Sequence, residues 1–257
     1  MLSNRLDGKI ALVTGIGSGI GRACALMFAR HGARVMGCDI DPQTAQLTVA
    51  AAAAENLPVS SVHPCDLTKP VDVQRLIDAT VARYGGIDIL LNAAAFGAFA
   101  WIEEMDFATQ WKATLAGELD VVFLACKAAW PHLIKRGGGS IINFASANAH
   151  VALEGSAALA HCAGKGGVLA MTRQLAMEGG PHRIRANTIS PGMIVTGATL
   201  PVLNTVKGFE EHVLAKKMLK RLGQPEDVAW CATYLASDES TWVTAADFSV
   251  DGGATGW

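Results

Sequence analysis

The chain has 257 residues, 51% of them hydrophobic and 17% charged, a balance that excludes a disordered chain and allows a large buried core. The net charge of −2 and the isoelectric point near 6.4 argue against a nucleic-acid-binding surface, which needs basic side chains. No apolar run approaches the roughly 20 residues that cross a bilayer, and the amino terminus lacks the apolar stretch of a signal peptide. We therefore expect a cytoplasmic protein that binds neither nucleic acid nor membrane.

Short apolar runs alternate with helical patterns along the whole chain. In chain order, the sequence predicts a strand at 9–14, a helix at 20–28, a strand at 34–38, a helix at 42–56, a strand at 59–64, a helix at 73–81, a strand at 87–91, a helix at 106–136 interrupted only by Pro131, a strand at 140–145, a helix at 158–178, a strand at 184–189, a helix at 225–237 and a strand at 246–250.

This alternation, with strands that are continuous apolar runs, is typical of a parallel sheet covered by helices on both faces. The sequence contains no internal repeat, linker or low-complexity segment, so it predicts a single α/β domain over residues 1–257. The stretch from 191 to 222 is the longest without a predicted strand, and we expect a substrate lid over about residues 193–222.

Six cysteines are scattered singly through the chain, at positions 24, 38, 65, 126, 162 and 231. A zinc site or a disulfide framework needs tighter spacing than this. We therefore expect small buried side chains in a reducing compartment, and no metal.

A glycine-rich loop follows the first predicted strand and reads Thr14-Gly15-Ile16-Gly17-Ser18-Gly19-Ile20-Gly21. Glycines let the backbone approach a pyrophosphate, and the next helix offers free N–H groups and the positive end of its dipole. Asp39 follows Gly21 by eighteen residues, at the end of the second predicted strand. A carboxylate there accepts hydrogen bonds from an adenosine ribose and repels a 2′-phosphate, which favours NAD over NADP.

The spacing T-G-x-x-x-G-x-G in this loop resembles that of the short-chain dehydrogenase/reductase family, and the resemblance extends over nearly the whole chain. Asp66, in Cys65-Asp66-Leu67, stands where family members bind the adenine edge. The segment 92–95 (NAAA) is similar to the family's N-N-A-G, with its second Asn and its Gly replaced by Ala.

Further segments carry the resemblance towards the carboxyl terminus. Residues 190–196 (SPGMIVT) resemble the P-G-x-x-x-T segment that holds the nicotinamide carboxamide, and residues 221–229 and 250–253 match two carboxy-terminal signatures. The resemblance implies a doubly wound Rossmann-type domain with seven parallel strands, and usually a homotetramer. It places the cofactor on Gly15, Ser18, Gly19, Ile20, Gly21, Asp39, Ile40, Asp66, Leu67, Asn92, Ala94, Lys165, Pro191, Ile194 and Thr196.

The resemblance also implies four catalytic positions, two of which depart from the family's Asn, Ser, Tyr and Lys. Ser146 matches the serine that holds the substrate oxygen, and Lys165 matches the lysine that binds the nicotinamide ribose. The Tyr of Y-x-x-x-K appears as His161, and the Asn that follows a Trp by seven residues appears as Glu118.

A histidine at position 161 suits acid/base chemistry because an imidazole exchanges a proton near neutral pH. Residues four apart share a helix face, so His161 and Lys165 should point into one pocket. Glu118 would act on His161, and it could also pair directly with Lys165. The alternatives for His161 are a positional or substrate-binding role and an inactive site.

The first hypothesis is therefore an NAD-dependent oxidoreductase that moves a hydride between the nicotinamide and a small secondary alcohol or ketone. The rivals are a lyase or hydrolase on the same scaffold, in which His161 activates water, and a catalytically dead NAD-binding sensor. The intact cofactor motifs disfavour a hydrolase, which has no need of NAD. Phe96, Phe99 and Trp101 either wall an apolar substrate pocket or pack in the core or between subunits.

Overall fold

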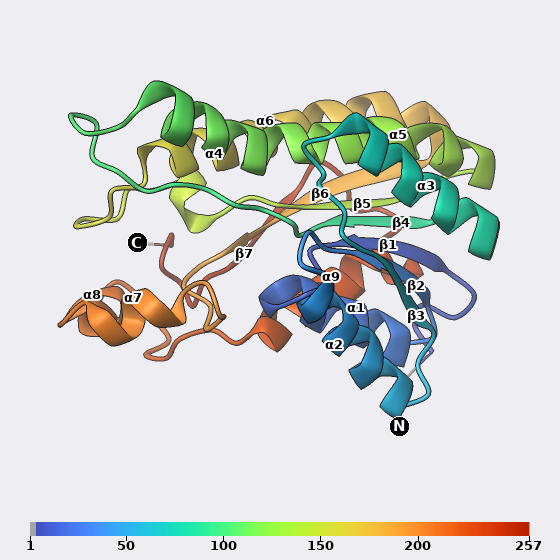
Figure 1. The fold of residues 1–257 in the computed structure, drawn as a ribbon, viewed down its shortest axis with the longest axis horizontal. Coiled ribbons are helices and arrows are strands. Elements are labelled where there is room, and N and C mark those ends of the chain that lie inside the picture. The colour runs from blue at the N-terminus through green and yellow to red at the C-terminus, as the bar shows by residue number, and fades with distance from the viewer. Residues whose placement is uncertain (1–3, 257) are drawn as a thin grey trace.

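Within residues 4–256, which the computed structural model describes, seven short segments form one parallel sheet (Figure 1). The strands are β1 (Ile10–Thr14), β2 (Arg34–Cys38), β3 (Val59–Val62), β4 (Ile89–Asn92), β5 (Gly139–Phe144), β6 (Ile184–Pro191) and β7 (Asp247–Val250). Their order across the sheet is β3-β2-β1-β4-β5-β6-β7, and neighbouring strands are parallel throughout. The predicted α/β fold with a doubly wound seven-stranded sheet is confirmed.

Strand β1 lies in the interior of the sheet, between β2 and β4, where helices cover both faces. All five of its residues are buried, as expected for a strand covered by helices above and below. It pairs with β2 on one side and β4 on the other, so that Thr14 lies in register with Cys38 and Asn92. The chain winds in opposite directions on the two sides of this point, which opens a crevice at the carboxyl ends of the strands.

Helices cover both faces of the sheet (Figure 1). One face carries α1 (Gly19–Arg30), α2 (Pro42–Ala54) and α9 (Pro225–Ala236), and the other carries α3 (Pro70–Tyr84), α5 (Val121–Arg136) and α6 (Leu159–Gly179). The shorter helices are α4 (Ala113–Leu115), α7 (Leu200–Thr205) and α8 (Phe209–Ala215). Single 3-10 turns form η3 (Ala147–Ala149), η4 (Gly180–His182) and η5 (Asp238–Ser240), and π-helical segments form η1 (Phe107–Lys112) and η2 (Ala116–Asp120).

Each face of the sheet has its own apolar core. Phe28 and Leu235 are fully buried between α1, α9 and the sheet. Leu76 and Leu133 are buried to the same degree between α3, α5 and the other face. The two cores fix the sheet rigidly, so the loops at its carboxyl end project from a firm base.

The predicted interruption of the long helical region at Pro131 is wrong, because α5 continues through this residue. Pro131 lacks a backbone N–H, but neighbouring side chains such as Leu133 are buried in the core and hold the helix in place. The irregular part lies earlier, where η1 and η2 flank the short helix α4.

The predicted lid, residues 193–222, follows β6 and contains α7 and α8. Strand β6 extends to Pro191 because Ser190 and Pro191 pair with β7. Figure 1 shows α7 and α8 at the same end of the sheet as the loops that follow β4 and β5. Among the helices of residues 4–256, none combines the length and the apolar character that a membrane span requires.

Candidate active site

A cavity of about 350 Å³ lies at the carboxyl ends of β1, β2 and β4. Loops from widely separated parts of the chain form its wall. The predicted cofactor residues that line it are Gly15, Ser18, Gly19, Ile20, Gly21, Asp39, Ile40, Asp66, Leu67, Ala94 and Thr196. The tertiary structure therefore brings most of the predicted cofactor residues around one space.

The glycine loop packs closely against the loop after β4, beside the start of α1. A Cβ atom on Gly15 would lie 2.8 Å from backbone atoms of Ala94, and its φ of +71° is a left-handed conformation that favours glycine. Helix α1 begins at Gly19 and has no acidic side chain in its first turn. Its N–H groups and the positive end of its dipole therefore fit the pyrophosphate of a dinucleotide.

Asp39 is oriented by the backbone around it. Its Oδ2 accepts a hydrogen bond from the N–H of Gly17 at 2.8 Å, and its Oδ1 accepts one from the N–H of Asp41 at 3.0 Å. Each carboxylate oxygen has a second lone pair, so both can also accept from ribose hydroxyls. A Cβ on Gly17 would lie 2.8 Å from Oδ2, so this glycine, which the predicted cofactor set omitted, is needed to seat Asp39.

Asp66 follows β3 and is also held as a charged acceptor. Its Oδ1 accepts hydrogen bonds from the hydroxyl and the N–H of Thr68 at 2.6 and 3.1 Å, and its Oδ2 lies 3.1 Å from Nζ of Lys69. The Thr68 hydroxyl lowers the pKa of Asp66, and Lys69 adds to this effect. The carboxylate therefore stays ionised at neutral pH and can accept from an amino group such as that of adenine.

Four residues that the sequence predicted for the cofactor do not line this cavity, as the described residues 4–256 form it. Asn92 is buried and donates through Nδ2 to Oδ1 of Asn143 at 2.8 Å, which ties β4 to β5. Pro191 ends β6, Ile194 lines a second cavity, and Lys165 lies on α6 among the predicted catalytic residues.

The predicted catalytic residues come from η2, from the loop after β5 and from α6. Nδ1 of His161 lies 2.6 Å from Oε1 of Glu118, and Nε2 of His161 lies 3.3 Å from Oγ of Ser146. The N–H of Asn148 donates to the same Oγ at 3.1 Å, which restrains the Ser146 hydroxyl. Glu118, His161 and Ser146 thus form a continuous row of hydrogen-bonding groups.

This row can move a proton. A carboxylate accepts hydrogen bonds but does not donate them, so the proton in the contact with Glu118 belongs to Nδ1 of His161. In a neutral imidazole, Nε2 is then the acceptor, and it faces the Ser146 hydroxyl. Nε2 can take a proton from a nearby hydroxyl group and, once protonated, return it.

Lys165 is buried beside this row. Its Nζ donates to the carbonyl oxygen of Phe144 at 3.2 Å. Burial lowers the pKa of Lys165, and the negative charge of Glu118 works against this effect. A direct ion pair between Glu118 and Lys165, which the sequence allowed, is not present among residues 4–256, because Glu118 pairs with His161 instead.

An aromatic side chain borders the row formed by Glu118, His161 and Ser146. The ring centroid of Phe99 lies 5.5 Å from that of His161, and more than half of the Phe99 side chain is exposed. A β-bridge between Ala100 and Ala158 joins the loop after β4 to the residue before α6. This bridge explains how Phe99 comes close to His161, and Phe96 of the same loop lines the cofactor cavity.

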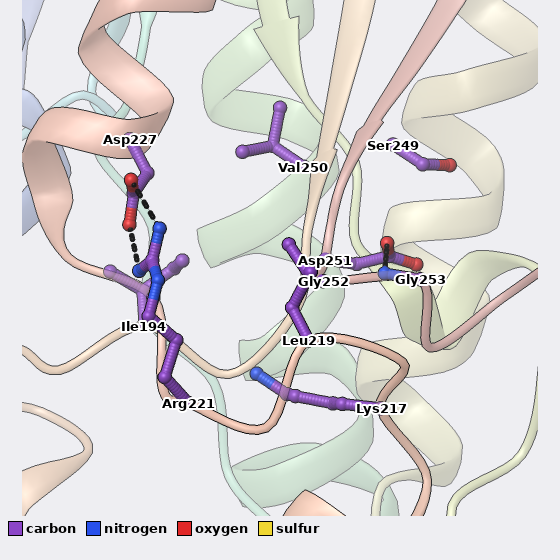
Figure 2. A pocket seen from close by; sticks show the side chains of 11 residues that line it. Ile194, Lys217, Leu219, Arg221, Asp227, Ser249, Val250, Asp251, Gly252 and Gly253 are labelled. Carbon is purple, nitrogen blue, oxygen red and sulfur yellow. Dashed lines mark hydrogen bonds and ion pairs between the residues drawn. The ribbon is translucent and has the colours of Figure 1, made fainter.

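A second cavity, of about 370 Å³, lies where the base of the predicted lid meets the end of β7 (Figure 2). The N–H of Gly223 donates to the carbonyl of Met193 at 3.0 Å, and Nζ of Lys217 donates to the same carbonyl at 3.2 Å. Figure 2 shows Arg221 facing Asp227 of α9, and their closest atoms are 2.6 Å apart. The two ends of the lid are therefore joined to each other and to α9.

Comparison with known proteins decides the family. The family profile described as Enoyl-(Acyl carrier protein) reductase matches residues 15–255. D-threitol dehydrogenase of Mycolicibacterium smegmatis is 38% identical over 253 residues, which cover 98% of this chain and 94% of that protein. The chain belongs to the short-chain dehydrogenase/reductase family. It is therefore an oxidoreductase of a family whose dehydrogenases use a nicotinamide cofactor, and the cavity at the glycine loop fits such a group.

Other known proteins resemble the chain over nearly its whole length. Borneol dehydrogenase of Lavandula x intermedia is 38% identical over 252 residues, which cover 98% of this chain and 92% of that protein. The crystal structure of gox2181 has a TM-score of 0.93 and 32% identity, and the match covers 99% of this chain and 98% of that one. A short-chain type dehydrogenase/reductase from Mycobacterium marinum has a TM-score of 0.92 and 31% identity, over 98% of this chain and 97% of that one.

One polar contact of this short-chain dehydrogenase/reductase lies outside the sequence-based prediction. Nε2 of His150, in the loop after β5, lies 2.9 Å from Oδ2 of Asp247, and Oδ1 of Asp247 accepts from Ser190 at 2.8 Å. These contacts tie the loop after Ser146 to β6 and β7. No local motif marks Asp247, because its partners are 97 and 57 residues away in the chain.

Proposed function

We propose that the protein is an NAD-dependent short-chain dehydrogenase/reductase that interconverts a secondary alcohol and a ketone, with His161 as the acid/base. The observation that carries this proposal is the row of contacts from Glu118 through His161 to Ser146, with distances of 2.6 and 3.3 Å. It gives His161 a free acceptor nitrogen beside a hydroxyl group. In the family, a Tyr occupies the position that we assign to His161, and an Asn the position of Glu118.

The preference for NAD rests on Asp39. Its carboxylate is fixed by the N–H groups of Gly17 and Asp41 and lines the cofactor cavity. Two ribose hydroxyls would add hydrogen bonds to it, whereas the 2′-phosphate of NADP would bring negative charge against it. The first turn of α1 carries no acidic side chain, so its N–H groups can bind the pyrophosphate.

Each catalytic residue has a distinct role in this proposal. Ser146 donates a hydrogen bond to the substrate oxygen and so orients it. During alcohol oxidation Nε2 of His161 accepts the hydroxyl proton, and during ketone reduction it returns that proton. Lys165 binds the nicotinamide ribose, and its positive charge balances the negative charge of the Glu118 carboxylate. The nicotinamide ring, when bound, supplies the chemistry of hydride acceptance and donation.

The surroundings of His161 favour a neutral, apolar small molecule as substrate. Phe99 presents an exposed ring beside the imidazole, and Leu159 at the start of α6 is also partly exposed. The loop at 93–102 carries no charged residue, and neither does the stretch 191–206 of the predicted lid. A charged substrate would lose its hydration here without gaining a partner from either segment.

Hydrolysis is the second candidate, because the order Ser146, His161, Glu118 is that of a serine, a base and an acid in acyl transfer. Family membership and the nicotinamide cavity favour hydride transfer instead. Incubation with NAD and a panel of neutral secondary alcohols, followed by the absorbance of the reduced nicotinamide, tests the proposal. Cleavage of activated esters without any NAD reduction would favour the hydrolase.

The assembly and the compartment are part of the same proposal. We infer a homotetramer from the family and from half-exposed apolar side chains such as Phe123 on α5 and Met177 on α6. All six cysteines are free, which supports a reducing compartment such as the cytoplasm.

A further inference from the structure

The carboxylate of Glu118 lies between two glycines that come from distant parts of the chain. A Cβ atom on Gly164, in α6, would lie 2.8 Å from Oε2 of Glu118 and 3.2 Å from its Cβ. A Cβ on Gly97, in the loop after β4, would lie 3.1 Å from Oε1. The first distance is shorter than real contacts of Cβ atoms, so a side chain at position 164 would push the carboxylate away.

Neither glycine is required by the backbone. Gly97 and Gly164 both have negative φ values, which any residue can adopt. Gly164 also lies inside α6, where glycine is less favourable than alanine. The room that Glu118 occupies is therefore the physical reason for a glycine at this position.

The segment that carries Glu118 is hydrogen-bonded to the loop that carries Gly97. Glu118 lies in the π-helical turn η2, and such turns occur frequently at functional sites. The N–H of Phe96 donates to the carbonyl of Gly117 at 3.2 Å, and the N–H of Ala98 donates to the hydroxyl of Thr114 at 2.9 Å. The loop and the helical segment therefore hold Glu118 and Gly97 at a fixed separation.

Within this space only one of the two carboxylate oxygens of Glu118 is hydrogen-bonded among the described residues. Oε1 contacts Nδ1 of His161, whereas Oε2 is buried and has no hydrogen-bond partner among the described residues. A displaced carboxylate would lose the contact with Nδ1. The imidazole would then be free to place its single proton on either ring nitrogen.

We propose that Gly97 and Gly164 form a glycine cradle for the Glu118 carboxylate, and that Glu118, held in this cradle, keeps the proton of neutral His161 on Nδ1. Nε2 is thereby kept free as the base that faces Ser146 and the substrate oxygen. Glu118 is a positioning residue in this arrangement, since it acts through His161. The inference rests on the acid/base role of His161 in the proposed function.

A pair of glycine variants in α6 tests the cradle. Gly164→Ala should lower turnover roughly 10²-fold, because misplacing a catalytic group by about 1 Å costs that much. Gly166→Ala is the matched control, since a Cβ there meets nothing within 4 Å. Both changes favour the helix, so both variants should fold, and their affinity for NAD should equal that of the parent. Equal turnover in the two variants would overturn the cradle.

A second readout does not depend on turnover. Nitrogen NMR of labelled histidine rings distinguishes the two neutral tautomers, and His161→Ala identifies the His161 signals among those of the seven histidines. The parent and Gly166→Ala should show the proton of His161 on Nδ1, whereas Gly164→Ala and Glu118→Gln should show a mixture. An unchanged tautomer in both of these variants refutes the inference. If the parent oxidises no alcohol but the tautomers change as expected, the proposed function fails and the cradle stands.

Discussion

Oε1 of Glu118 and Nδ1 of His161 lie 2.6 Å apart, although 43 residues separate them in the chain. Glu118 comes from the π-helical turn η2, and His161 from the first turns of α6. Both side chains are mostly buried, so water does not compete for the contact. Because Glu118 pairs with His161, Lys165 has no direct ion pair to Glu118 among the described residues. The same contact orients His161 so that its Nε2 faces Ser146.

Replacing His161 should greatly lower turnover and leave the binding of the cofactor unchanged. We expect His161→Ala to lower turnover by roughly 10²–10⁴-fold, the usual effect of losing a general base. Binding of NAD, measured by titration calorimetry, should be unchanged because the glycine loop and Asp39 remain. Full activity in His161→Ala would exclude His161 from proton transfer.

Removing the charge of Asp39 should weaken the choice of cofactor. The parent should bind NAD more tightly than NADP by roughly 10²-fold or more, because like charges brought together cost several kcal/mol. Asp39→Asn keeps an oxygen that can accept from the N–H of Gly17 but loses the charge, so the two affinities should approach each other. Calorimetric titrations with both cofactors measure this. Equal affinities in the parent would contradict the assignment of NAD.

Phe99 should contribute to binding of apolar substrates rather than to proton transfer. Burying a phenylalanine side chain contributes about 1.5–3 kcal/mol, so Phe99→Ser should raise KM for an apolar ketone roughly tenfold or more with little change in kcat. Phe107→Ser removes an exposed ring on η1 and serves as the control. Steady-state kinetics that show the same KM for both variants would remove Phe99 from the substrate site.

The apolar outer faces of α5 and α6 should be buried between subunits. Light scattering of the parent should give four times the chain mass of 26.9 kDa. Phe123→Glu places a charge on α5 and should yield smaller species, whereas Leu47→Glu, at a similarly exposed position on α2, should leave the tetramer intact. A parent protein that is monomeric would rule out the proposed assembly.

The ion pair between Arg221 and Asp227 should stabilise the protein in a pH-dependent way. The hydrogen bonds from Arg221 lower the pKa of Asp227 from 3.8 to about 2. The folded state therefore releases this proton more readily than the unfolded state, and the contribution to stability is complete above pH 3.8 and lost as the pH falls towards 2. Asp227→Asn should lower the urea midpoint at neutral pH. The difference from the parent should shrink at pH values within this window.

The sequence by itself determined the features that depend on local chemistry. The glycine loop from Gly15 to Gly21 and the acidic residue at the end of β2 predicted a dinucleotide site, because strand, turn and helix follow one another directly in the chain. Alternating apolar runs and helical patterns predicted the parallel sheet. The failure at Pro131 had a physical cause, since burial of the surrounding α5 side chains outweighs the loss of one backbone hydrogen bond.

Only the tertiary structure decided which partner Glu118 takes. The sequence allowed both His161 and Lys165, because both lie on one face of α6. The choice depends on where η2 directs the carboxylate and on the space that Gly97 and Gly164 leave for it. Hydrogen bonds require an alignment within a few tenths of an ångström. Segments 43 residues apart reach that alignment only when the sheet and its helices have packed.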